Sequence, residues 1–214
     1  MPTEDHVPPL THLRNFTRAR SKGRATLVAA DRQQVEAPSE NRVFAFAYQR
    51  FLTALLDYMD NGSRGSALDQ AVLRASDRMR RRYDIAATGM KAILAAHPVR
   101  SARRQQRNTV VLDLDGYEMV SRRLQVEVSM RDGRQVYAFM HFPHGALTPL
   151  EVLLMDTAIA LAVRQVNPAG IPAVIMVRTG ILRYINVDDA LHPDRVGFLR
   201  SESGAYRAEW AVAA

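Results

Sequence analysis

The chain has 214 residues, which suits one domain with extensions or two small domains, and its 47% hydrophobic content suits a buried core. It contains no cysteine, which excludes disulfides and thiolate metal sites and makes a cytoplasmic location the expectation. The net charge is +7, and only Lys22 and Lys91 are lysines, so the positive charge is almost entirely arginine, a side chain suited to phosphate.

Residues 1–38 are predicted to form an irregular basic arm. Prolines and glycine interrupt this segment, and its apolar periodicity is weak. Its first nine residues include acidic side chains and no apolar stretch, so a secretion signal is not expected. The arm would become ordered on a polyanion. Its candidate phosphate contacts are Arg14, Arg18, Arg20, Lys22 and Arg24.

Residues 39–108 are predicted to be a helical region. Apolar residues at three- and four-residue spacing indicate helices over 39–60, 66–83 and 85–96. Asn61-Gly62 ends the first helix, and His97-Pro98 ends the third. The second helix places a basic cluster on one face, and a basic connector follows the third. These two groups supply further candidate phosphate contacts: Arg78, Arg81 and Arg82 on the helix, and Arg100, Arg103, Arg104 and Arg107 in the connector.

Residues 109–214 change to the two-residue period of strands. We expect strands over 109–114, 124–130, 135–142, 173–177 and 181–187, with a tight turn at Asp132-Gly133. Thr148-Pro149-Leu150-Glu151 begins a helix over 149–166 that is apolar nearly all round and therefore buried. A last hairpin is expected to join 196–200 to 206–212.

These elements predict an α/β (α+β) fold in which N-terminal helices precede a mixed β-sheet with one buried helix. Residues 39–214 then form either two regions or a single domain. No stretch approaches the roughly 18 apolar residues of a membrane span, so no membrane partner is expected.

Side chains with obvious chemistry are sparse. No two histidines have the spacing of a helical metal site, no glycine-rich phosphate loop is present, and no Ser-His-Asp arrangement stands out. Asp113 and Asp115 are reasonable metal ligands, although two acids before Gly116 are more typical of a solvated turn. The sequence therefore predicts no metal site and no cofactor.

The order of strand, Asp-Gly hairpin, strand, buried helix and strand resembles the core of the PD-(D/E)XK nucleases, with the RecB nucleases as the closest comparison. The resemblance covers residues 39–187, and Glu40-Asn41-Arg42 would match the acidic helix that leads into that core. It implies a restriction-endonuclease-like fold.

That family holds a divalent metal with an acid on the first hairpin strand and an acid and lysine on the second. Glu127 matches the first acid, but Phe139 and His141 stand where the acid and lysine are expected. The resemblance therefore implies a scaffold kept for binding. An active version would be a Mg²⁺-dependent nuclease using Glu127, Asp113, Asp115 and His141.

The leading hypothesis is a non-catalytic nucleic-acid-binding subunit, docking on DNA or RNA within a larger complex of protein subunits. One alternative is the metal-dependent nuclease. Another is an interaction subunit whose basic surface meets an acidic protein partner. Arginine-rich codon usage without such a role is a further reading of the composition.

Overall fold

A computed structural model describes residues 6–19, 23–36, 47–104, 109–114, 118–123, 126–143 and 145–213. The chain folds as a mixed α+β structure, as predicted. Its centre is a five-stranded sheet in the order β1-β4-β5-β6-β7. The strands are β1 (Val99–Arg104), β4 (Val126–Met130), β5 (Gln135–His141), β6 (Ile171–Met176) and β7 (Ile181–Tyr184).

All neighbouring strands of this sheet are antiparallel except β5 and β6. Parallel strands need a crossover, and helix α7 (Pro149–Val166) supplies it. Between β4 and β5 the predicted turn at Asp132-Gly133 is confirmed. Gly133 has φ +89°, a conformation that favours glycine. Asp132 supports the turn by accepting a hydrogen bond from the Arg134 amide at 3.1 Å.

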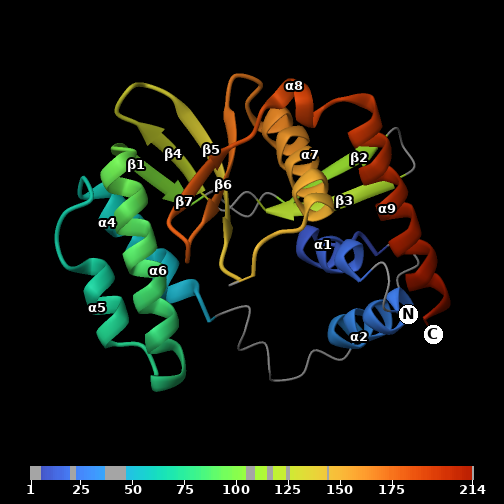
Figure 1. Cartoon of the computed structure of the whole chain (residues 1–214), viewed down its shortest axis with the longest axis horizontal. Coiled ribbons are helices and arrows are strands. Elements are labelled where there is room, and N and C mark those ends of the chain that lie inside the picture. Colours follow the sequence, from blue (N-terminus) through green and yellow to red (C-terminus); the bar gives the residue numbers. More distant parts are fainter. Residues whose placement is uncertain are drawn as a thin grey trace.

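Three helices cover one face of the sheet, on the left in Figure 1. They are α4 (Gln49–Asp60), α5 (Ala67–Leu73) and α6 (Asp77–Ala96). Their buried side chains, such as Phe51, Leu55 and Met90, pack against Val136 and Ala138 of β5 in one hydrophobic core. We call this group of three helices the α4–α6 layer.

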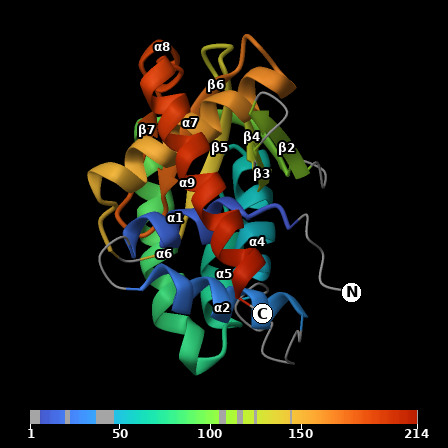
Figure 2. The same ribbon diagram turned by 90° about the vertical axis from the view of Figure 1, so that its right-hand side faces the viewer.

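The opposite face is covered by α7, α1 (Leu10–Arg18), α2 (Arg24–Glu36), α8 (Val187–Ala190) and α9 (Pro193–Val212). A second core lies here and includes Phe16, Phe139, Leu154 and Tyr206. Figure 2 views this side, with α9, α1 and α2 in front of the sheet. Strands β2 (Thr109–Leu114) and β3 (Glu118–Arg123) form a separate antiparallel hairpin beside α7 and α9.

Helix α7 occupies the residues predicted for the buried helix. The Thr148 amide donates to Glu151 Oε2 at 2.8 Å, and the Glu151 amide donates to Thr148 Oγ1 at 3.3 Å, which completes the expected capping box. The helix lies between the sheet and the helices α1, α8 and α9. This placement explains why it is apolar nearly all round.

The expected hairpin joining 196–200 to 206–212 is wrong, because the structure forms α9 over Pro193–Val212. Its buried residues Leu199, Glu202, Tyr206 and Trp210 recur every three or four positions, which is helical spacing. The residues 201–204 suggested a turn, yet Ser203 is buried inside the helix. The start signal was present at His192-Pro193, where the His192 ring accepts a hydrogen bond from the Asp194 amide at 3.4 Å.

Two other expectations need correction. The part of 1–38 that the structure describes contains helices α1 and α2 in place of an irregular arm, and Leu13, Phe16 and Val28 anchor them in the core. The boundary between the helices expected over 66–83 and 85–96 lies earlier in the chain, because α5 ends at Leu73 and α6 begins at Asp77. Residues 37–46, including Glu40-Asn41-Arg42, lie outside the described chain. None of the described helices is long and apolar enough to cross a membrane.

Candidate nucleic-acid interface

The arginines of the predicted basic arm are largely engaged within the protein. Arg14 Nε lies 3.7 Å from Glu151 Oε1, and Arg24 Nη2 donates to Glu202 Oε2 at 2.5 Å. Both carboxylates are only 1% exposed, so each arginine neutralises a buried charge. Arg18 is exposed, whereas Arg20 and Lys22 lie outside the described residues. Arg14 and Arg24 therefore hold α1 and α2 on the molecule.

Most of the net charge belongs to the opposite side of the sheet. Residues 47–104, which form the α4–α6 layer and β1, contain eleven lysines and arginines against five aspartates and no glutamate. This segment alone contributes +6 of the net charge of +7. The positive charge is thus concentrated on one layer and on the edge strand beside it.

The first turns of α6 hold part of this charge. Arg78 and Arg81 are exposed, Arg82 is half-buried, and Arg80 forms an ion pair with Asp77 at 3.2 Å. A helix begins at the positive end of its dipole, where each added cation costs about 0.3–1 kcal/mol. Four arginines within the first six residues therefore create a positive field that favours an anion.

The predicted basic connector forms the edge strand β1 instead of an irregular segment. Its arginines at 100, 103 and 104 are exposed, while Val99 and Ala102 point into the core. The Arg103 guanidinium donates two hydrogen bonds, of 2.8 and 3.0 Å, to the carboxylate of Glu127 on the neighbouring strand. Arg107 lies outside the described residues.

Contacts between elements connect α4 with β1 and with α6. Arg104 Nη2 donates to Gln49 Oε1 at 2.7 Å, which links the end of β1 to the start of α4. Next to Gln49, the exposed Arg50 lies near Tyr83 of α6, where burial raises the pKa of the tyrosine and the arginine charge opposes that rise. We call this set the arginine surface: Arg50, Arg78, Arg81, Arg82, Arg100 and Arg104. Arg103 is not part of it, because its partner Glu127 lies opposite Tyr137, on the side of the sheet that α7 covers.

Arg50 was not singled out from the sequence. Its place depends on the contact between Gln49 and Arg104, which are 55 residues apart. A single charged residue at the start of a helix gives no local signal of such a neighbour.

The residues of the nuclease hypothesis do not gather at one point. Glu127 lies opposite Tyr137 in the sheet and is paired with Arg103. His141 lies four residues beyond Tyr137 on β5, about 13 Å along the strand. Asp113 belongs to the separate β2–β3 hairpin, and Asp115 lies outside the described residues. Among described side chains, no three His, Asp or Glu residues are arranged to hold a metal ion.

His141 instead joins a buried polar cluster between α1, β5 and α7. Its Nδ1 lies 3.2 Å from Arg14 Nη1, and its side chain is enclosed, with the residue 2% exposed. Burial, followed by the charge of Arg14, lowers the pKa of His141 to about 4 against the opposing effect of Glu151. The imidazole is therefore neutral at pH 7 and helps to seat α1 against the sheet.

Comparisons with protein-family models, with curated proteins and with solved structures found no match to this chain.

Proposed function

We propose that the chain binds nucleic acid without cleaving it, through the arginine surface, as one subunit of a larger nucleoprotein complex. The observation that carries this proposal is the concentration of +6 of the net charge in residues 47–104, which form the α4–α6 layer and the edge strand β1 (Figure 1). Nucleic-acid affinity depends chiefly on such neutralisation of phosphates.

The arginines on the two sides of the sheet support the proposal by their different surroundings. Arg14, Arg24 and Arg183 neutralise buried acids. Within the described chain, Arg50, Arg81 and Arg100 have no acidic partner and extend into solvent. An exposed guanidinium without a carboxylate offers its planar fork of donors to a phosphate.

The proposal is tested by measuring the affinity of the protein for fluorescently labelled DNA and RNA oligonucleotides of about 20 nucleotides across a range of salt concentrations. The wild-type affinity should fall steeply as salt rises. R81A/R104A should weaken binding and reduce the slope of log K against log salt by about 1.8, because each phosphate contact contributes about 0.9.

A matched control is R164A/R195A, which removes the same charge from the opposite layer and should leave affinity and slope near wild type. A flat salt response, or equal losses in both double variants, would contradict the proposal. Tight binding of an acidic protein in place of both nucleic acids would favour the interaction-subunit alternative.

The nuclease alternative has weaker support, because Glu127 is held by Arg103 and lies far along the sheet from His141. It predicts cleavage of the same probes in Mg²⁺ or Mn²⁺, abolished by Glu127→Ala. Cleavage with that dependence would replace the binding proposal.

A further inference from the structure

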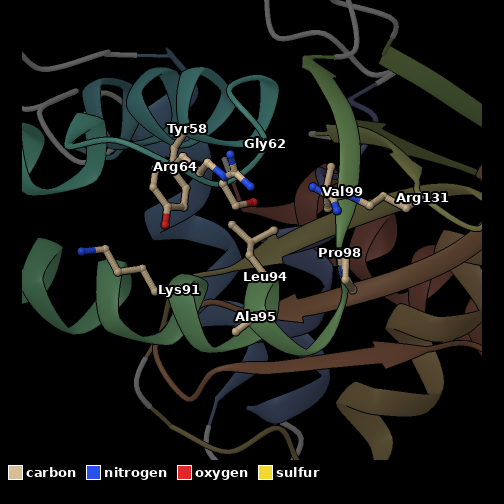
Figure 3. Close-up of a pocket in the computed structure, with 10 residues that line it drawn as sticks. Tyr58, Gly62, Arg64, Lys91, Leu94, Ala95, Pro98, Val99 and Arg131 are labelled. Carbon is tan, nitrogen blue, oxygen red and sulfur yellow. The ribbon is translucent and has the colours of Figure 1, made fainter.

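A pocket of about 290 Å³ lies where the C-terminal parts of α4 and α6 meet the start of β1 (Figure 3). The α4–α5 turn contributes Gly62, Ser63 and Arg64 to its wall. The β4–β5 turn contributes Arg131, whose amide donates to the Pro98 carbonyl at 3.1 Å. The pocket lies beside β1 at the end opposite Arg104, so it is distinct from the contact that joins β1 to α4.

The wall of the pocket is cationic. It includes Arg64, Lys91 and Arg131 and no acidic residue. Lys91 is neutralised by Asp69, with oxygens 2.7 and 2.9 Å from Nζ. Arg64 and Arg131 have no ion pair with any carboxylate of the described chain. Figure 3 shows the side chains of Arg64 and Arg131 extending towards the space above Leu94.

Helix dipoles neutralise only part of the positive charge of Arg64 and Arg131. The C-terminal ends of α4 and α6 both lie here, and each is equivalent to about half a negative charge. Together they offset about one of the two arginine charges. A bound anion would balance the remainder.

Ser63 adds an unsatisfied donor to the same wall. Its φ is +61°, in the left-handed region that few residues other than glycine adopt. Its Oγ is buried, and within the described chain it has no hydrogen-bond partner. A strained residue with an unpaired buried hydroxyl is costly unless something else satisfies it.

The remaining wall is apolar, and includes Tyr58, Leu94, Pro98 and Val99. A small pocket with convergent polar donors on one side and apolar side chains on the other is typical of ligand sites. It suits a ligand with an anionic head and a less polar body.

We propose that this pocket binds a phosphomonoester group, held by the guanidinium forks of Arg64 and Arg131 with the Ser63 hydroxyl as a further donor. The group belongs to a free nucleotide or to the 5′ end of a nucleic-acid strand. The site goes beyond the function proposed above and does not require the arginine surface to bind nucleic acid.

The first test is calorimetric titration of the full chain with inorganic phosphate and with a nucleoside 5′-monophosphate. Both should bind saturably, and the unphosphorylated nucleoside should bind at least about tenfold more weakly. R64A/R131A should reduce the affinity for phosphate about tenfold or more, because charge-assisted guanidinium bonds are lost. Absence of phosphate binding, or unchanged affinity in R64A/R131A, would overturn the proposal.

Two further variants make the test specific. Arg134 belongs to the same turn as Arg131 but is paired with Asp132 at 2.7 Å, so R134A should retain wild-type phosphate affinity. Ser63→Gly removes the hydroxyl and relieves the left-handed strain, so it should fold normally and bind phosphate several-fold more weakly. Equal losses in R134A and R64A/R131A would show a general charge effect and overturn the site.

The source of the phosphate is distinguished with oligonucleotides. Preference for a 5′-phosphorylated over an unphosphorylated strand, lost in R64A/R131A, identifies a strand end. Mononucleotide binding without that preference identifies a free nucleotide. The variant R81A/R104A should leave phosphate binding unchanged, so failure of the arginine surface and failure of the pocket are separately visible.

Discussion

Arginine has two different roles on the two sides of the sheet. On one side it neutralises carboxylates that are less than a tenth exposed, in the pairs Arg14–Glu151, Arg24–Glu202, Arg183–Asp156 and Arg103–Glu127. On the other side it is mostly exposed, along β1 and α6. A buried carboxylate that loses its partner is strongly destabilising, whereas an exposed arginine contributes little to stability. Composition alone cannot separate the two roles.

His141 should make stability depend on pH. Its folded pKa of about 4 lies below the ordinary value of 6.5, so the unfolded chain takes up the proton first as pH falls. Stability should therefore decrease from pH 6.5 down to about 4, by about 3 kcal/mol from this residue. Urea unfolding between pH 7.5 and 4.5 measures the loss, and His141→Gln should reduce it.

The control is His97→Gln, which removes a half-buried imidazole at the end of α6 and should keep the wild-type pH dependence. His6 adds an effect of the same sign, because burial lowers its pKa as well. An unchanged loss in His141→Gln would show that another group is responsible.

At the scale of elements, α6 approaches the β6–β7 turn through two glycines. A Cβ on Gly89 would lie 2.2 Å from the Val177 carbonyl oxygen, and a Cβ on Gly180, which has φ +70°, would lie 3.3 Å from Gly89 Cα. The added Cβ would contact backbone atoms, so α6 or the β6–β7 turn would have to shift to accommodate it. The close contact joins the α4–α6 layer to the far edge of the sheet.

Gly89→Ala should therefore destabilise the protein by roughly 1–3 kcal/mol, although alanine is the better helix former. Gly197→Ala in α9 is the matched control, because a Cβ there meets no atom within 4 Å. It should stabilise the protein by about 0.5–1 kcal/mol. Chemical denaturation of the two variants decides the point, and opposite signs are the expected result.

At the scale of the whole molecule, two hydrophobic cores share one sheet. Val136 and Ala138 of β5 face the α4–α6 layer, while Tyr137 and Phe139 face α7 and α9. If either helical layer unfolded, the apolar side chains of the sheet that it covers would be exposed to water, and the strands that pack against the other layer would be destabilised. The fold should therefore unfold as one cooperative unit.

The single tryptophan allows a direct measurement of this cooperativity. Trp210 is buried in the α9 core, so its fluorescence reports on that layer, whereas circular dichroism reports on helices of both layers. The two signals should change at the same denaturant concentration. A fluorescence transition at lower denaturant would mean that α1, α2 and α9 detach independently.

The charge distribution is also a property of the whole molecule. Arg104 of β1 lies next to the start of α4 only because β1 is the edge strand beside that helix. An interior position of β1 would have covered this arginine with a further strand. The phosphate pocket depends on the same arrangement, because its wall combines three segments separated along the chain.

Local signals in the sequence determined α7 and the β4–β5 hairpin. The capping residues Thr148 and Glu151 and the turn at Asp132-Gly133 act within a few residues, so their effect does not depend on the rest of the fold. The mixed α+β class follows from the same patterns of period 3.6 and period 2.

Tertiary structure decided α1, α2 and α9. Their hydrophobic content is modest, and their buried polar pairs, such as Thr17–Glu202 and Asp31–Tyr206, join residues more than 170 positions apart. It also decided which arginines neutralise buried acids and which remain exposed, and it separated Glu127 from His141. A sequence fixes which residue types are present, but burial and charge pairing depend on partners that only folding brings into contact.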